Sequence, residues 1–253
     1  MRPDEFETRM RRLEAFHALR CPDGAWPILR LDGRGFTRFT EERCEKPFDE
    51  RFHGWMVATA RTVLDDFGGV YAYTESDEIS VLFPRGWGLF DREVEKAVSV
   101  AAGLASATFA LACGAPAHFD ARAVVAATDG LVVDYFRWRQ ADATRCALNG
   151  WCYWTLRKEG HDPRAATRQL AGLAVADKNE LLFRRGVNFN DVPAWQRRGT
   201  GLWWEEYPHT GHNPVTGEQV PTTRRRIREE RDLPIGEAYS ALVAGLLVES
   251  GGI

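Results

Sequence analysis

The sequence predicts a mixed α+β fold whose elements follow the order strand, helix, strand, strand, helix, strand. Apolar residues alternate in short runs at 27–31, 70–83 and 117–126, which is typical of strands. They recur at helical spacing over 49–67 and 91–113. The chain has 253 residues, 44% of them hydrophobic, so it is long enough to bury a sizeable core.

The first strand and the first helix are separated by a glycine-containing segment. The run PILRL at 27–31 is a short strand that ends next to Asp32. The segment 49–67 then places apolar side chains on one helical face, namely those of Phe52, Met56, Ala60, Val63 and Leu64. Gly68 and Gly69 end this helix.

A hairpin follows these glycines. The segment VYAYTESDEISVLF predicts two strands joined by a tight polar turn, which carries Glu75, Ser76, Asp77 and Glu78. The helix over 91–113 and the strand over 117–126 complete the pattern. This order is that of the ferredoxin-like, split βαβ arrangement, with four antiparallel strands and two helices on one face.

Composition and charge exclude several classes of protein. The N-terminal segment mixes acids and arginines at helical spacing and has no apolar core, so we expect neither a signal peptide nor a membrane anchor. No stretch approaches the roughly 20 apolar residues of a bilayer span. The five cysteines are scattered and include no Cys-x-x-Cys pair. This argues against a disulfide framework and a structural zinc site, and it favours a reducing cytoplasm.

The charge distribution leaves two interpretations open. The net charge is −3, but arginines gather in the C-terminal half, at 184–185, 197–198, 224–226 and 228. They form either a basic surface for a polyanion or ordinary solvated faces of helices and strands.

The residues around the first strand predict a metal site. In the expected sheet this strand neighbours the hairpin, so Asp32 lies beside Asp77 and Glu78. Carboxylates brought together repel unless a cation lies between them, and Mg²⁺ prefers such hard oxygen ligands. Gly33 lets a backbone carbonyl join the ligands, and Gly35 lets the chain pass close to a triphosphate. The arrangement is typical of two-metal phosphoryl transfer.

Basic residues near these acids are candidate phosphate ligands. Arg30 lies two residues before Asp32 and points to the same face, and Lys46 follows in the next loop. Arg92 and Lys96 are four residues apart and share one face of the expected helix. Each has an alternative: Arg30 pairs with Asp77, and Arg92 and Lys96 belong to a solvated face.

An ordered set of motifs resembles the tRNA-His guanylyltransferase family. It spans about residues 28–205, most of the chain, with spacings similar to those of the family. The motifs are LRLDGRGFTRF, KPFDERF, YTESDEISVLF, FDARAVV, YFRWRQADATRCALNGWCYWTLR, LAVADKNELLF and RRGVNFND. Each is weak alone, but the ordered set is specific.

The resemblance implies a nucleotidyltransferase that adds nucleotides to the 5′ end of tRNA in the 3′–5′ direction. A palm-type polymerase core at 1–130 would be completed by a helical and hairpin extension at 131–253. The 5′-monophosphate of the RNA would be activated with ATP or GTP and then attacked by the 3′-hydroxyl of an incoming nucleotide, with two Mg²⁺ ions. We expect tRNA and nucleoside triphosphates as partners, no membrane, and a cytoplasmic homo-oligomer, either a dimer or a tetramer.

The resemblance also implies roles for individual residues. Asp32, the Gly33 carbonyl and Asp77 would hold metal, with Glu78 as a third catalytic acid. Nucleotide contacts would come from Asp32, Gly33, Arg34, Gly35, Phe36, Thr37, Ser76 and Asp77. The triphosphate would bind Arg30, Lys46, Arg92 and Lys96. Further functional positions are Lys178, Asn179 and Asn188.

One segment departs from the family pattern. After RQAD the family commonly has a His-Ile-Asn-Asn-like segment, whereas Thr144, Cys146 and Ala147 stand at those positions here. This favours the guanylyltransferase-like branch, which resembles a template-directed 5′-end repair enzyme more than a dedicated tRNA-His modifier.

Two other functional classes compete with this interpretation. A nucleotide cyclase, or another ferredoxin-like nucleotide enzyme, needs the same carboxylates without an RNA groove. The basic C-terminal half and the ordered later motifs argue against it. A catalytically silent RNA-binding module is opposed by the retention of all three acids.

The C-terminal half offers other features with simple interpretations. His209 and His212 fall in a Gly/Pro/Thr-rich segment that predicts a hairpin loop. Trp138, Trp151 and Trp154 follow a helical pattern that predicts packing in a core or an interface. The tail from Pro234 has apolar residues at helical spacing, so it should pack on the domain or on another subunit.

Overall fold

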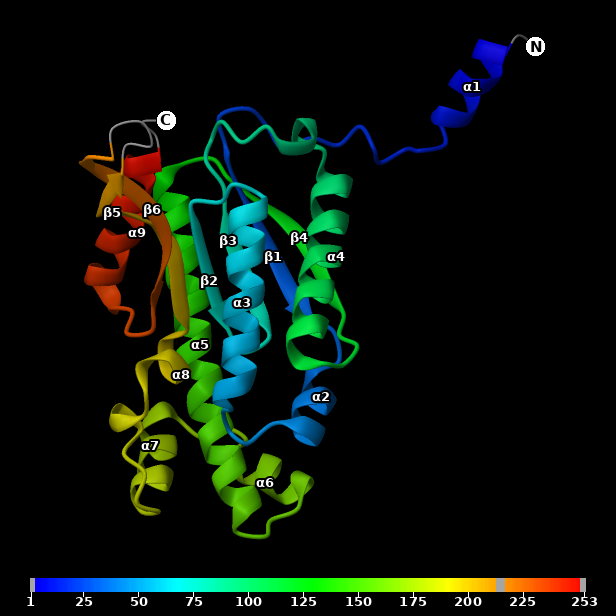
Figure 1. The fold of residues 1–253 in the computed structure, drawn as a ribbon. Helices are drawn as coiled ribbons and strands as arrows, with labels where there is room; N and C mark the ends of the chain where they lie inside the picture. The colour runs from blue at the N-terminus through cyan, green and yellow to red at the C-terminus, as the bar shows by residue number, and fades with distance from the viewer. Residues whose placement is uncertain (1–2, 213–216, 251–253) are drawn as a thin grey trace.

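The computed structural model describes residues 3–212 and 217–250, in which six antiparallel strands form one sheet in the order β4-β1-β3-β2-β5-β6 (Figure 1). The strands are β1 Trp26–Gly33, β2 Tyr71–Glu75, β3 Glu78–Leu82, β4 Phe119–Ala126, β5 Thr200–His212 and β6 Gln219–Glu230. The first four strands and the two helices between them follow the predicted order. The sheet is wider than four strands because β5 pairs with β2 and β6 pairs with β5.

Helices cover both faces of the sheet. The N-terminal half contains α1 Pro3–Arg11, α2 Phe36–Arg43, α3 Glu50–Asp66 and α4 Val94–Cys113, with the 3₁₀ turn η1 Leu89–Arg92 before α4. The C-terminal half contains α5 Asp129–Lys158, α6 Pro163–Leu170, α7 Val175–Phe183, η2 Phe189–Asp191, α8 Ala194–Arg198 and α9 Gly236–Ser250. In Figure 1, α1 stands apart from the body of the molecule.

Local signals explain where the two helices nearest the site begin. The Asp49 side chain accepts a hydrogen bond from the backbone N–H of Arg51 at 2.8 Å, which caps α3. The Thr128 side chain accepts from the N–H of Leu131 at 3.3 Å and caps α5 in the same way. Both helices therefore start at fixed points next to the sheet.

The alternation of β1 divides its residues between two cores. Leu29 and Leu31 are buried on the face that α3 and α4 cover. Ile28 is buried on the opposite face, against Phe136 of α5 and Tyr239 of α9. The expectation that the tail packs on the domain is therefore confirmed. A third cluster joins the second half of α5 to α6 and α7.

Two predicted boundaries were wrong. Residues 207–212, expected in a loop, continue β5, and His209 pairs with Thr222 of β6; residues 213–216 lie outside the described residues. The helix expected from residue 91 begins at Val94, because the backbone of Phe90, Asp91 and Arg92 has positive φ and forms the η1 turn instead.

Contrary to the expectation that no stretch approaches a bilayer span, helix α4 is long and apolar enough to cross a membrane by length and composition alone. In this fold it packs along the sheet instead. Ala97, Ala101, Ala105 and Phe109 form its buried stripe against the core that α3 also contacts. These residues are four apart, close to the 3.6-residue period of a helix that lies on a surface.

Candidate active site

The end of β1 and the turn between β2 and β3 lie together at one end of the sheet. Asp32 pairs directly with Glu78 of β3, and the Gly33 N–H donates a hydrogen bond to the Asp77 carbonyl at 3.0 Å. Sheet pairing thus brings Asp32 beside the hairpin, as predicted. Glu75 and Glu78 belong to the strands, so the turn itself consists of Ser76 and Asp77.

Four carboxylates follow one another across this end of the sheet. The register pairs Asp120 with Asp32, Asp32 with Glu78, and Glu78 with Glu75. Residues directly opposite in antiparallel strands project to the same face, here the face that α5 covers. The sequence analysis assigned no role to Asp120 or Glu75, because strand register is needed to place them in this row.

The carboxylates raise one another's pKa values. Burial, and then the charge of Asp32, raises the pKa of the Asp77 carboxyl. Burial together with the charge of Glu78 raises the pKa of Glu75 to about 8. Burial also raises the pKa of Glu78, although Arg139 acts in the opposite direction. A cation placed at this end of the sheet would therefore be stabilised.

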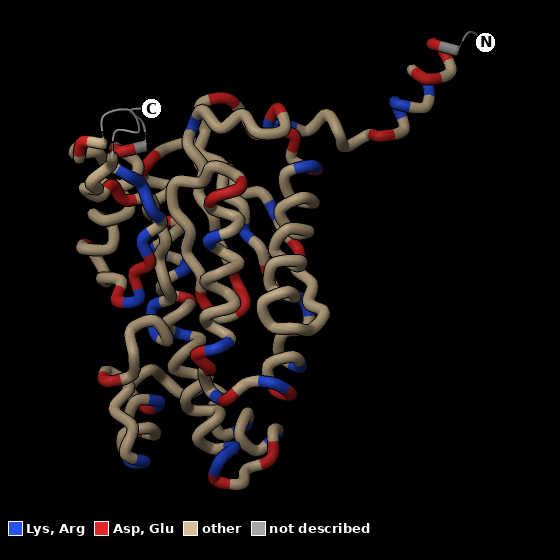
Figure 2. The backbone as a smooth tube through the Cα atoms, viewed as in Figure 1, with Lys and Arg blue, Asp and Glu red and all other residues tan. Residues whose placement is uncertain are grey.

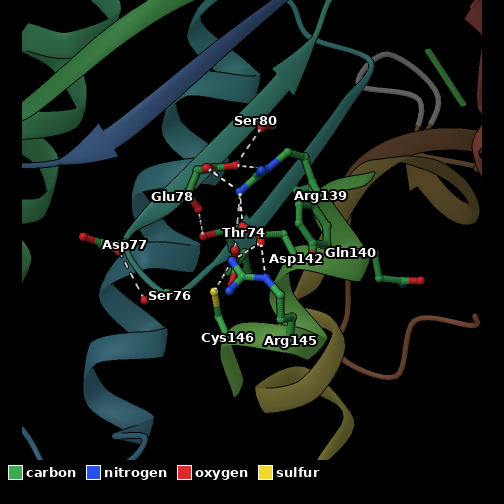
Figure 3. A network of polar contacts seen from close by, with 12 residues as sticks. Thr74, Ser76, Asp77, Glu78, Ser80, Arg139, Gln140, Asp142, Arg145 and Cys146 are labelled. Carbon is green, nitrogen blue, oxygen red and sulfur yellow. Dashed lines mark hydrogen bonds and ion pairs between the residues drawn. The ribbon is translucent and has the colours of Figure 1, made fainter. Parts of the chain in front are cut away.

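One arginine of α5 already binds part of this row (Figure 3). The Arg139 Nε donates to Glu78 Oε1 at 2.6 Å, and its Nη2 donates to Glu78 Oε2 at 2.7 Å. In Figure 3 the Asp77 side chain points away from this pair. Glu78 therefore has both oxygens engaged by a guanidinium, which the sequence analysis did not foresee. A sequence signal existed: Arg139 lies on the same helical face as Val132, Phe136 and Ala143, where an apolar residue is expected.

A cavity of about 560 Å³ opens beside Asp77. Residues from several parts of the chain line it, including α3, α6 and α8. Ser76 and Asp77 come from the hairpin turn, Phe36, Thr37, Thr40 and Lys46 from α2 and the loop after it, and Ala143, Arg145, Cys146 and Ala147 from α5. Its size suits a nucleotide-sized ligand.

The predicted nucleotide residues divide into two groups. Phe36, Thr37, Ser76 and Asp77 line the cavity, while Asp32, Gly33, Arg34 and Gly35, in and just after β1, do not line it. Packing explains why residue 33 is glycine, because a Cβ there would meet the Phe36 ring at 2.6 Å. Gly35 has a φ of 75°, which favours glycine. Contacts between these residues and a nucleotide stay a prediction.

Two of the predicted phosphate ligands lie near the acids. Lys46 lines the cavity, donates to Thr40 Oγ1 at 2.5 Å and lies over the Trp154 ring at 5.3 Å. Burial lowers the pKa of its ammonium group. Arg30 forms no ion pair with any described residue, Asp77 included, and its buried Nε has no hydrogen-bond partner. The Arg30 guanidinium lies over the Trp138 ring at 5.7 Å, which encloses this side of β1.

The other two predicted phosphate ligands, Arg92 and Lys96, do not lie near the acidic residues. The Arg92 carbonyl accepts a hydrogen bond from Cys21, and Arg92 forms an ion pair with Asp23, both near the start of β1. Asp32 lies at the other end of that strand, and at ~3.3 Å per residue the two ends are about 20 Å apart. Within one chain the expected set of four phosphate ligands does not meet, and Arg92 is not on the helix that carries Lys96.

The remaining predicted residues lie in the helical extension. Lys178 and Asn179 belong to α7, where Asn179 Nδ2 donates to the Val175 carbonyl at 2.9 Å. The Asn188 side chain donates to Asp191 at 2.9 Å at the start of η2. None of the three lines the cavity.

The segment that departs from the family pattern forms one wall of the cavity. Arg145, Cys146 and Ala147 line it. Thr144 does not: its hydroxyl bonds the carbonyls of Gln140 at 3.1 Å and Arg197 at 2.9 Å. The departure thus changes the surface that a ligand would contact.

The fold and the site define an α+β nucleotidyltransferase, with acids at one end of its sheet beside a nucleotide-sized cavity. Residues 7–127 match the family model for tRNA-His guanylyltransferase, and residues 130–237 match the Thg1 C-terminal domain. The chain belongs to the tRNA-His guanylyltransferase family.

Individual relatives agree with this assignment. A probable tRNA(His) guanylyltransferase of Mus musculus is 32% identical over 227 residues, 82% of this chain and 76% of that protein. A bacterial tRNA(His) guanylyltransferase-like protein in complex with ATP superposes with a TM-score of 0.78 at 27% identity, covering 96% of this chain and 98% of the other. A complex of such a protein with GTP gives 0.74 at 26% identity, covering 96% and 99%.

Proposed function

We propose that this chain adds nucleotides to the 5′ end of tRNA in the 3′–5′ direction, with ATP and GTP as nucleotide substrates. Membership of the family and the ATP and GTP complexes of similar bacterial proteins support it. The observation that carries the proposal is the 560 Å³ cavity, which brings Asp77, Lys46 and Arg145 around one space at the acidic end of the sheet.

In this proposal residues 1–130 act as a palm-like core of ferredoxin-like topology, and residues 131–253 complete the same domain. The order β4-β1-β3-β2, with α3 and α4 on one face, supports the first part. The pairing of β5 with β2 and the burial of α5 and α9 against the other face support the second.

The residues at the end of β1 fit Mg²⁺. Asp32, Asp77 and the Gly33 carbonyl offer hard oxygen ligands, and the raised pKa of Asp77 reflects burial and uncompensated charge from Asp32. The described residues contain no group of three or more His, Cys, Asp or Glu placed to hold a metal. Phosphate and water oxygens would therefore complete the coordination. Two bound ions would stabilise charge on the attacking and leaving oxygens.

Protein side chains would bind and orient the phosphates. Lys46 is held by Thr40 and Trp154 at the cavity wall, so its ammonium group is fixed before a ligand arrives. Arg30 offers its unpartnered Nε from the same face of β1 as Asp32. In activation of the RNA 5′ end and in nucleotide addition, a phosphorus atom is attacked. These cations would balance the negative charge of the phosphates in each reaction.

The β5–β6 hairpin, along which Figure 2 shows basic residues in blue, would supply a surface for RNA. Three guanidinium groups lie over aromatic rings there: Arg225 over Trp204 at 5.1 Å, Arg226 over Tyr207 at 5.0 Å, and Arg228 over Trp203 at 5.3 Å. Cations interleaved with half-buried rings suit a phosphate backbone and unpaired bases. Arginines 184, 185, 197 and 198 bind acids or backbone carbonyls of this chain. On the hairpin, Arg226 pairs with Glu205 and Arg228 pairs with Glu230, each at 2.6 Å, so Arg225 is the one of the three without an ion pair among the described residues.

Two further parts of the proposal concern the cellular compartment and the oligomeric state. The five cysteines are free thiols, which fits a reducing cytoplasm. A homo-oligomer, either a dimer or a tetramer, is supported by the outer face of α4, where Val100 and Leu111 are exposed.

A direct assay tests the activity. Labelled 5′-monophosphorylated tRNA lacking its first nucleotide is incubated with ATP, Mg²⁺ and each NTP in turn, and the product is lengthened by one residue at its 5′ end if the proposal holds. An unchanged RNA contradicts it. Conversion of ATP to a cyclic nucleotide without RNA would favour the cyclase alternative.

A further inference from the structure

Arg139 lies at the centre of a buried polar network that connects three elements (Figure 3). Its side chain is only 6% exposed. It binds both oxygens of Glu78 on β3, approaches Glu75 on β2 to 3.7 Å, and donates to Asp142 on its own helix at 3.2 Å. One guanidinium group therefore fixes the last residue of β2 and the first residue of β3 relative to α5.

The turn between those two residues is short and has an unusual backbone. Only Ser76 and Asp77 separate Glu75 from Glu78, and Ser76 has a φ of 49°. A serine in that conformation is uncommon and persists where its surroundings hold it. The Thr74 hydroxyl also donates to the Glu78 carbonyl at 2.9 Å across the turn. Holding both ends of the turn sets the position of Asp77.

The same arginine reaches the opposite wall of the cavity. Asp142 accepts from Arg139 and also from Arg145 Nε at 3.0 Å, and Arg145 lines the cavity. The chain Glu78–Arg139–Asp142–Arg145 thus runs from the acidic hairpin to the wall that a nucleotide would contact.

We infer that Arg139 is a positioning residue, which holds Asp77 for the divalent cation through Glu78 and holds Arg145 for the nucleotide through Asp142. The inference rests on the proposed function. It also changes the role expected for Glu78: its carboxylate anchors the hairpin to α5 and does not act as a third catalytic acid.

Two variants test whether Arg139 holds Asp77 in place through Glu78. Arg139→Lys keeps the positive charge but cannot donate two parallel hydrogen bonds to the Glu78 carboxylate. The double variant Glu78→Gln/Arg139→Gln removes both charges and leaves two amide side chains that can still form a hydrogen bond with each other. Arg137→Lys is the matched control, because Arg137 is exposed on the same helix and lies 3.8 Å from Glu237. Mn²⁺ binding to each folded protein, without nucleotide, is measured by the loss of the free-ion EPR signal.

We expect both variants to bind Mn²⁺ about 10- to 100-fold more weakly, as for loss of a residue that orients a metal ligand. Raising Mg²⁺ should restore part of the turnover of Arg139→Lys, since the ligands themselves remain. Arg137→Lys should behave as wild type. Asp142→Asn tests whether Arg139 holds Arg145 through Asp142. In this variant ATP should bind more weakly while Mn²⁺ affinity stays unchanged.

The outcomes separate the possible roles. Wild-type Mn²⁺ affinity in folded Arg139→Lys and in the folded double variant would overturn the inference while leaving the proposed function intact. Loss of folding in both variants would assign the ion pair to stability alone and would also overturn it. If the wild-type protein binds neither Mn²⁺ nor ATP, the proposed function fails, and the inference fails with it.

Discussion

The Gly33 N–H donates a hydrogen bond to the Asp77 carbonyl at 3.0 Å, and this bond joins the end of β1 to the β2–β3 turn. It brings two short acidic side chains, those of Asp32 and Asp77, to the same end of the sheet. Because both sit on backbone that is held by sheet pairing, their separation depends on the fold more than on side-chain rotation.

Removing either of these acids should abolish activity without unfolding the protein. We predict that Asp32→Ala or Asp77→Ala lowers both activation and nucleotide addition by at least ~10²-fold, by analogy with the loss of one charge-stabilising group. Activity is followed with labelled tRNA and folding by circular dichroism. Asp65→Ala, at an exposed position of α3, is the matched control. Near-wild-type turnover in either active-site variant, with metal still bound, would refute the assignment.

Acid should destabilise the fold through His53. This buried histidine bonds Thr200 at 2.8 Å, and burial, with the charge of Arg231, lowers its pKa to about 4. The unfolded chain binds a proton near pH 6.5, so it holds more protons than the folded chain between pH 4 and 6.5. The free energy of unfolding should therefore fall as the pH drops through this window, by about 3 kcal/mol in total.

The variant His53→Gln tests this contribution, because glutamine can still bond Thr200 but does not titrate. Urea unfolding of the variant and of the wild type is compared at several pH values between 4 and 7. An equal loss of stability in both proteins would show that His53 is not responsible.

RNA binding should depend on Arg224 and Arg225, which are exposed on the hairpin and form no ion pair with the described residues, and much less on arginines that are already paired. Arg224→Glu with Arg225→Glu should weaken tRNA binding and reduce the slope of log affinity against log salt by about one unit per lost phosphate contact. Arg184→Glu is the control, because Arg184 is bound to Glu180 at 2.6 Å. Fluorescence anisotropy over a salt series gives the slopes. A salt-independent affinity of the wild type would mean that these arginines form only a solvated surface.

Nucleotide choice should follow base pairing. The segment 144–147, of which Arg145, Cys146 and Ala147 line the cavity, lacks the histidine and asparagines common in the family, so it offers few hydrogen-bonding groups that a wrong partner would leave unpaired. We expect the base opposite the missing position to select the NTP. Two truncated tRNAs that differ only in that base are compared. Equal addition of guanosine to both, or addition only with a histidine anticodon, would contradict the prediction.

Short-range patterns in the sequence were enough to determine the order of the first four strands and of α3 and α4, but not the width of the six-stranded sheet. The alternation in β1, β2, β3 and β4 and the helical spacing in α3 and α4 depend on neighbouring residues, so their order could be predicted without coordinates. The polar turn at Ser76 and Asp77 was visible for the same reason. The long β5–β6 pairing was missed at 207–212, because glycine, proline and threonine in that segment are also typical of loops.

Only the tertiary structure decided which charged groups meet. Asp120 opposes Asp32 because of the β1–β4 register, Arg139 reaches Glu78 because α5 crosses that end of the sheet, and Arg92 lies too far away because η1 precedes α4 near the start of β1. These relationships join residues far apart in the chain. They depend on long-range strand register and helix packing, which local propensity and spacing do not specify.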